Sequence, residues 1–221
     1  MSPVMENRNK NVTLVLGGAR SGKSLYAQEL AAAFERVTFI ATGRATDAEM
    51  RRKIARHRRE RPGSWKTIEA PLNLAEAIRF ESQAADLILV DCLTVYVANV
   101  IGAGRKRSKS DRQECIGAVC EAMRASKASV IAVSNEVGSG VVPPYRSGRV
   151  YRDLLGQMNQ RVAQIADRVV LMIAGVPMTV KDTRISRRSG DASLAGAAAD
   201  ESSRSANGAR KRHSRLGKRF A

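Results

Sequence analysis

The fold is decided by one stretch, Gly17-Gly18-Ala19-Arg20-Ser21-Gly22-Lys23-Ser24. It matches the phosphate-binding pattern G-x-x-x-x-G-K-[ST], and it follows the apolar run Val12–Leu16 and precedes a helical pattern. Such glycines let successive backbone N–H groups turn toward phosphate oxygens, and the start of the helix adds partial positive charge. Lys23 would reach the β- and γ-phosphates, and the Ser24 hydroxyl would bind Mg²⁺. The alternative is a glycine-rich turn without a ligand.

Five short apolar runs predict buried strands, at Val12–Leu16, Val37–Ala41, Leu87–Asp91, Val130–Val133 and Val169–Ile173. Their nearly continuous apolar character is typical of a parallel sheet covered on both faces. Helical stripes separate the strands. The chain therefore predicts an α/β fold of the P-loop NTPase type, a doubly wound, mainly parallel sheet with helices on both faces. A tight turn after Gly175 would add an edge strand at Met178–Lys181.

A carboxylate, Asp91, ends the third of these strands. This is the Walker-B arrangement, in which Asp91 would hold Mg²⁺ from the side opposite Ser24. A turn-initiating aspartate is the alternative. Together with the glycine-rich loop, Asp91 predicts a nucleotide-binding enzyme that moves a phosphoryl group. A small-molecule kinase is favoured, because the chain lacks the Asn-Lys-x-Asp motif with which GTPases read the base.

One of the two histidines, His57, lies in the basic segment Arg56–Arg61. Adjacent guanidinium charges favour the neutral, nucleophilic imidazole and could hold a triphosphate in line for attack. A histidine that attacks phosphorus forms a phosphoramidate, so a nucleotidyl group could be carried there. The alternative is a half-buried histidine on the helical stripe Met50, Ile54 and His57, beside a solvated basic face.

Part of the net charge of +17 lies at the C-terminus. Residues 182–221 hold ten Lys/Arg and four Asp/Glu, and their sizeable apolar residues are Ile185, Leu194, Leu216 and Phe220. This composition cannot bury enough surface to offset the entropy of ordering, so we expect a disordered basic tail. The chain then divides into an N-terminal extension (1–11), a P-loop domain (12–181) and the tail (182–221).

Composition also restricts location and partners. No stretch is long and apolar enough for a membrane span, and the N-terminus lacks the apolar run of a secretory signal, so a cytoplasmic protein is expected. Three cysteines without CxxC spacing fit reduced thiols. A polyanion-binding ATPase is disfavoured, because aromatic residues make up only 4% and no aromatic-interleaved basic platform for stacking bases is present. Nucleic-acid binding stays open for the tail alone.

Four separated blocks resemble a known family: GGARSGKS, HRRERPGSWKTIEAP, LVDCLT and the segment that begins NEVGSGVVPPYRSGRVYRD. From about Thr13 to Lys181 the chain resembles the bifunctional adenosylcobinamide kinase / adenosylcobinamide-phosphate guanylyltransferase family of cobalamin biosynthesis. The resemblance implies two reactions. First, ATP or GTP phosphorylates the aminopropanol hydroxyl of adenosylcobinamide. Second, GTP guanylylates an enzyme histidine, and the GMP passes to adenosylcobinamide phosphate, giving adenosylcobinamide-GDP.

The resemblance further implies residue roles and an assembly. The nucleophile corresponds to His57, although some relatives carry two adjacent histidines where this chain has Arg56 and His57. Lys23 would be the second catalytic residue, and a homotrimer would place active sites between subunits. The implied nucleotide contacts are Gly17, Gly18, Ala19, Arg20, Ser21, Gly22, Lys23, Ser24, Ala41, Thr42, Gly43, Arg58, Arg59, Glu60, Arg61, Glu69 and Asp91.

Some assignments stay open at the level of sequence. Glu69 could accept hydrogen bonds from ribose hydroxyls or from a guanine N–H, or could be an exposed carboxylate at a helix start. Asn135 and Glu136 follow the strand Val130–Val133 and are candidate substrate or metal contacts, because doubly wound sheets bind ligands beyond strand C-termini. The alternative function is a P-loop kinase without guanylyltransferase activity.

Overall fold

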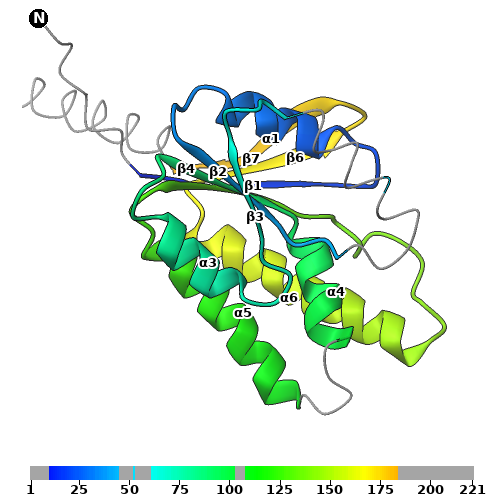
Figure 1. Ribbon diagram of the computed structural model, residues 1–221. Coiled ribbons are helices and arrows are strands. Elements are labelled where there is room, and N and C mark those ends of the chain that lie inside the picture. The colour runs from blue at the N-terminus through cyan, green and yellow to red at the C-terminus, as the bar shows by residue number, and fades with distance from the viewer. Residues whose placement is uncertain (1–9, 45–51, 53–60, 103–107, 184–221) are drawn as a thin grey trace, which may run out of the picture. The chain divides into compact units, whose positions relative to one another are not determined.

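The computed structural model describes residues 10–44, 52, 61–102 and 108–183. The chain divides into two units, residues 1–181 and 182–221, and nearly all described residues belong to the first. Within them, seven strands form one sheet in the order β3-β2-β4-β5-β1-β6-β7 (Figure 1). The sequence-based expectations for the N-terminal extension, for the helix carrying His57 and for the tail fall almost wholly outside the described residues.

The sheet is mainly parallel. β1 pairs in parallel with β5 and β6, and β4 joins β5 to β2, which pairs with β3. Only two residues, Ala174 and Gly175, connect β6 to β7, both with positive φ, and a connection this short permits only an antiparallel pair. The strands are β1 Val12–Gly17, β2 Val37–Ala41, β3 Lys66–Glu69, β4 Leu87–Asp91, β5 Ser129–Val133, β6 Arg168–Ile173 and β7 Val176–Asp182.

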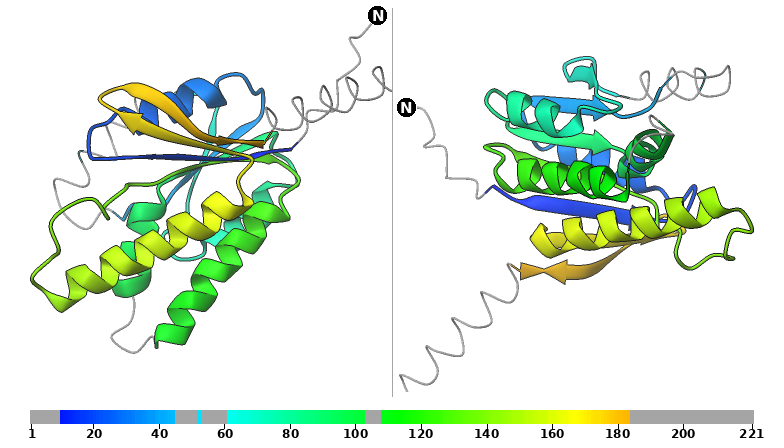
Figure 2. Two further views of the ribbon diagram at one scale, coloured as in Figure 1. Left: turned by 180° about the vertical axis from the view of Figure 1, so that it is seen from behind. Right: turned by 90° about the horizontal axis from the view of Figure 1, so that it is seen from below.

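Helices cover both faces of this sheet (Figures 1 and 2). On one face α1 (Lys23–Ala31) packs over a core that includes Phe39, Leu89 and Val170. The other face carries the larger core and four helices, α3 (Leu74–Glu81), α4 (Leu93–Gly102), α5 (Lys109–Arg124) and α6 (Arg146–Ile165). The predicted doubly wound α/β fold is confirmed. Among the described residues, none of the helices combines the length and apolar character that crossing a membrane requires.

Two elements were not predicted from the sequence. β3 is a four-residue edge strand whose sequence, KTIE, has no apolar run, so its strand character comes from pairing with β2. α4 has the sequence LTVYVANVIG and is buried on most sides, so it lacks the polar stripe from which a helix is normally recognised. The suggested edge strand after Gly175 is confirmed as β7.

The register of the parallel strands brings their carboxyl ends to one edge. Ala41 lies opposite both Glu69 on β3 and Asp91 on β4, and Asp91 in turn lies opposite Val133 on β5. Val133 is also the partner of Val15, two residues before the P-loop begins on β1. Segments that are far apart in the sequence therefore reach the same edge of the sheet.

The central strand β1 supplies a matched test of core packing. Leu14 on β1 is fully buried, whereas Leu25 on α1 is 64% exposed. We expect Leu14→Ala to lower the free energy of unfolding by about 2–5 kcal/mol, because it removes buried methyl groups and leaves a cavity. Leu25→Ala should stay within about 0.5 kcal/mol of the parent protein. Urea denaturation followed by circular dichroism measures both, and equal losses for the two variants would contradict this packing.

Candidate active site

β1 leads directly into the P-loop, residues 17–24, and α1 continues from it. The loop turns sharply because three residues have positive φ: Gly17 (154°), Arg20 (56°) and Gly22 (89°), the last being the N-cap of α1. Lys23 is only 9% exposed, and its Nζ donates to the Gly18 carbonyl at 2.6 Å. The ammonium is thus held over the backbone that would surround a phosphate, as the sequence motif predicts.

The hairpin formed by β6 and β7 contacts the P-loop and supports its backbone. The Gly175 N–H donates to the Ser21 carbonyl at 3.1 Å. A Cβ atom on Gly17 would lie 2.5 Å from the Ser21 Oγ and 2.6 Å from the Met172 carbonyl oxygen. Since real Cβ atoms do not approach backbone this closely, residue 17 must be glycine for the loop to pack against β6.

Asp91 reaches the same edge of the sheet as the P-loop, with β5 between β4 and β1. Two strand spacings separate their backbones by about 10 Å. The Ser24 hydroxyl and the Asp91 carboxylate are hard oxygen donors of the kind Mg²⁺ prefers. No group of three or more His, Cys, Asp or Glu that could hold a metal occurs among the described residues. Ser24 and Asp91 supply two oxygen donors, so Mg²⁺ held by them would need phosphate or water ligands as well.

Thr42, at the end of β2, is fully buried and holds this edge together. Its Oγ1 donates to the Cys92 carbonyl at 2.7 Å and accepts the Cys92 N–H at 3.0 Å. The Asn99 side chain on α4 donates to the Thr42 carbonyl at 2.8 Å, and the Thr42 N–H donates to the Asp91 carbonyl at 3.3 Å. The polar groups of Thr42 are all engaged within the protein, so Thr42 fixes the backbone at Asp91 and Cys92.

The pKa of the Cys92 thiol reflects burial and the charges at this edge of the sheet. Burial, followed by the negative charge of Asp91, raises the pKa of the Cys92 thiol to about 11, while the Lys23 ammonium acts in the opposite direction. The thiol therefore stays protonated and unreactive at neutral pH.

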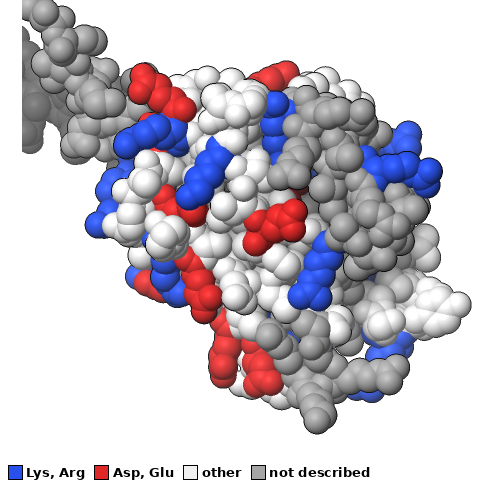
Figure 3. Space-filling model, in the orientation of Figure 1, with Lys and Arg blue, Asp and Glu red and all other residues white. Residues whose placement is uncertain are grey.

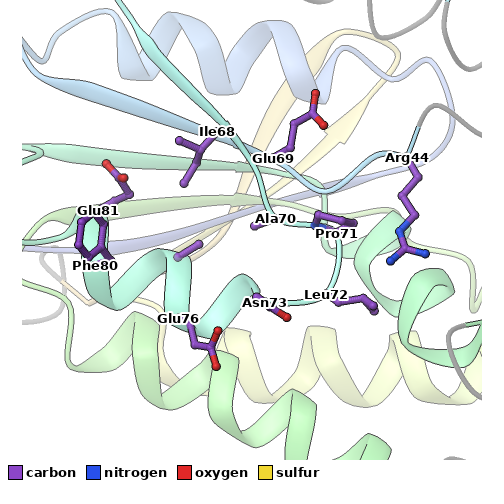
Figure 4. Close-up of a pocket in the computed structure, with 11 residues that line it drawn as sticks. Arg44, Ile68, Glu69, Ala70, Pro71, Leu72, Asn73, Glu76, Phe80 and Glu81 are labelled. Carbon is purple, nitrogen blue, oxygen red and sulfur yellow. The ribbon is translucent and has the colours of Figure 1, made fainter.

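Glu69 ends β3 and does not start a helix, which corrects the alternative considered for it. It is exposed and borders a pocket of about 550 Å³ between the carboxyl end of β3 and α3 (Figure 4). In Figure 4 the Glu69 side chain points away from α3, and the Arg44 side chain lies to the right of Pro71. The pocket is lined by Arg44, Ile68, Glu69, Ala70, Pro71, Leu72, Asn73, Glu76, Ala77, Phe80 and Glu81.

The basic segment is described only at its end. The Arg61 guanidinium lies 3.3 Å from the centroid of the Phe39 ring on β2, a cation–π contact that fixes the chain where it re-enters the described structure. His57, Arg58, Arg59 and Glu60 lie outside the described residues, so their roles stay predictions. Among the described residues on the face seen in Figure 3, acidic and basic side chains are interspersed.

The segment that follows β5 lies beside the P-loop. The Glu136 N–H donates to the Gly17 carbonyl at 3.1 Å, and the Asn135 carbonyl accepts a hydrogen bond from Asn159 on α6 at 3.0 Å. Sequence reasoning named Asn135 and Glu136 as candidates but missed Thr94, Asn99 and Asn159, which support this edge. A polar residue inside an otherwise apolar helix, such as Asn99 in α4, was the available signal.

Comparison of the chain with known proteins identifies its family. The model of the family "Cobinamide kinase / cobinamide phosphate guanyltransferase" matches residues 13–180. The chain belongs to this family. The family resemblance and the bifunctional kinase and guanylyltransferase class, both predicted from sequence, are confirmed.

Two relatives illustrate how much of the chain is shared. The bifunctional adenosylcobalamin biosynthesis protein CobP of Pseudomonas aeruginosa is 43% identical over 169 residues, which cover 76% of this chain and 96% of that protein. CobU of Escherichia coli, with the same description, is 36% identical over 76% of this chain and 98% of its own. A type III secretion ATPase aligns with 14% identity and a TM-score of 0.47, covering 76% of this chain and 56% of its own, too distant to inform function.

The P-loop offers a second matched test. Gly17→Ala should lower the free energy of unfolding by about 1–3 kcal/mol, because φ is 154° and the new Cβ would contact the Met172 carbonyl. It should also weaken nucleotide binding by displacing the loop. A Cβ on Gly18 meets no atom within 4 Å, so Gly18→Ala should unfold like the parent protein. Thermal unfolding with and without ATP distinguishes the two, and an unchanged Gly17→Ala would refute this packing.

Proposed function

We propose that this protein phosphorylates cobinamide with a nucleoside triphosphate and then transfers GMP from GTP to cobinamide phosphate through a guanylyl-histidine at His57. The observation that supports it most is the position of Lys23, Asp91 and Glu69 along one edge of the sheet, within the stretch matched by the family model. The adenosylated corrinoid is the substrate suggested by the names of the relatives.

In the kinase step the hydroxyl oxygen of the corrinoid side chain attacks the γ-phosphorus, and the nucleoside diphosphate leaves. Backbone N–H groups of the P-loop and the Lys23 ammonium would stabilise the charge on the transferring phosphoryl group. Mg²⁺ held by Ser24 and Asp91 would neutralise charge on the β- and γ-phosphates when bound. The buried position of Lys23, which is 9% exposed, supports this role because a charge is felt more strongly in a site that excludes water.

In the second step the imidazole of His57 would attack the α-phosphorus of GTP, and pyrophosphate would leave. A phosphate oxygen of the phosphorylated corrinoid then attacks the same phosphorus and displaces the histidine. Arg58, Arg59 and Arg61 would offset the negative charge of the triphosphate, with Glu60 beside them. The sequence block around His57, HRRERPGSW, supports this assignment, since it carries the one histidine within the stretch matched by the family model.

The guanosine half of GTP would occupy the pocket beside β3. Glu69 supports this, because it is exposed at the carboxyl end of β3, where its carboxylate can accept hydrogen bonds from ribose hydroxyls or a guanine N–H. The backbone of the Ala41-Thr42-Gly43 segment would contact the nucleotide between this pocket and Asp91. Ala41 lies opposite both Glu69 and Asp91 in the sheet, which supports this placement.

The same proposal includes a cytoplasmic homotrimer with active sites between subunits. Exposed apolar side chains between β5 and α6 support an assembly: Val141 is 94% exposed, Val142 59% and Tyr145 76%. Sedimentation equilibrium would give the mass of three chains if the proposal holds, and the mass of a single chain would rule it out.

The guanylyl-histidine is tested with GTP labelled at the α-phosphate. The parent protein should form a covalent adduct that is labile in acid and stable in base, as a phosphoramidate is. His57→Ala should form no adduct and yet keep its kinase activity, because the P-loop is unchanged. His213→Ala, which removes the other histidine, is the matched control and should label normally.

The outcomes separate the two functions. Label that persists in His57→Ala would overturn the assignment of the nucleophile. A parent protein that phosphorylates cobinamide without forming an adduct would identify the alternative, a kinase that lacks guanylyltransferase activity.

A further inference from the structure

Glu136, one of the candidate substrate or metal contacts considered from the sequence, is fixed beside the first residue of the P-loop. β5 and β1 are neighbours, with Val133 opposite Val15. The pairing continues past the end of β5, because the Ser134 N–H donates to the Val15 carbonyl at 2.9 Å and the Glu136 N–H donates to the Gly17 carbonyl at 3.1 Å. The backbone of Glu136 is therefore hydrogen-bonded to the P-loop itself.

The other carboxylates at this edge lie further along the sheet. Asp91 ends β4, which is separated from β1 by β5, and Glu69 ends β3, at the far side of β2. Since each strand step adds about 4.8 Å, Asp91 is about two steps and Glu69 about four steps from the P-loop strand. Among these three strand-end carboxylates, Glu136 is the one nearest to the P-loop.

Side chains from two helices hold the backbone on both sides of Glu136. Thr94 on α4 accepts the Asn135 N–H at 2.7 Å, and Asn159 on α6 donates to the Asn135 carbonyl at 3.0 Å. Arg152 on α6 donates to the Gly138 carbonyl at 2.6 Å. Thr94 and Asn159 are both buried, 8% and 5% exposed. Contacts from α4 and α6 thus fix this segment, which is preorganised as a catalytic group requires.

The Glu136 carboxylate itself remains open to solvent. The Glu136 side chain is exposed, and its Oε1 accepts the Gly138 N–H at 2.5 Å. A carboxylate has about four acceptor positions, so this single hydrogen bond leaves Oε2 able to accept another. Because the Glu136 backbone is hydrogen-bonded to Gly17, this oxygen belongs to the segment next to the loop that would bind the phosphates.

We propose that Glu136 is the general base of the kinase step, an inference that rests on the kinase half of the proposed function. The corrinoid hydroxyl donates its hydrogen bond to the carboxylate. As the new oxygen–phosphorus bond forms and the bond between the γ-phosphorus and the β,γ-bridging oxygen breaks, the hydroxyl proton passes to Glu136 and the nucleoside diphosphate leaves. The proton is then released to water, which restores the carboxylate. Guanylylation of His57 needs no such base, because a neutral imidazole nitrogen attacks with its own lone pair.

The test uses the full chain with Glu136→Gln, which keeps the shape of the side chain and removes its basicity. The kcat for phosphorylation of cobinamide should fall by about 10²–10⁴-fold, the usual contribution of a general base. The KM for ATP and the yield of the guanylyl adduct from labelled GTP should stay as in the parent protein. Glu121→Gln on α5 makes the same chemical change at an exposed site and is the matched control.

Three results would overturn the assignment. The first is a kcat close to that of the parent protein. The second is a parallel loss of kinase activity and adduct formation, which would show that Glu136 only supports the P-loop. The third is recovery of kcat at high Mg²⁺, which would make Glu136 a metal ligand. Failure of the parent protein to phosphorylate cobinamide would instead refute the kinase function itself.

Discussion

The hydrogen-bond register of the parallel strands is the constraint on which the site depends. Parallel strands end at the same edge, and here the pairing aligns Glu69, Ala41, Asp91 and Val133 in one row across four strands. A shift of one residue in any ladder would turn the side chains of that strand to the opposite face. The buried side chains on both faces make such a shift costly, so the two cores fix the positions of the polar groups at the edge.

This register places the candidate site residues at different positions along the edge of the sheet. Phosphate-binding groups gather at β1, where Lys23 closes over the loop, whereas the pocket next to Glu69 lies at the other end of the row. Thr42 and Asn99 fix the backbone between them through hydrogen bonds to Cys92 and across to α4. The lysine of the P-loop and the pocket beside Glu69 therefore lie in separate regions of one edge, which suits the proposed attack on a triphosphate at two different phosphorus atoms.

The parts that the sequence predicted are those encoded locally. The strand, loop and helix from Val12 to Ala31 are recognisable because glycine spacing, apolar run and lysine are contiguous. β3 was missed because the polar tetrapeptide Lys66–Glu69 becomes a strand only beside β2. The hydrogen bonds of Asn135 with Thr94 and Asn159 were also missed, since they join residues 41 and 24 positions apart and leave no local pattern. Local motifs indicate the kind of reaction, whereas long-range packing determines which side chains come into contact.

The position of β1 has a consequence for biosynthesis. This strand is made first, yet both of its partners, β5 and β6, lie in the second half of the chain. Until residue 173 has left the ribosome, Val12–Gly17 has an unpaired edge on at least one side, and the P-loop lacks the hairpin that supports it from behind. Apolar strands with open edges recruit other chains. Nascent or prematurely terminated chains therefore expose this strand to pairing with other chains until the hairpin closes.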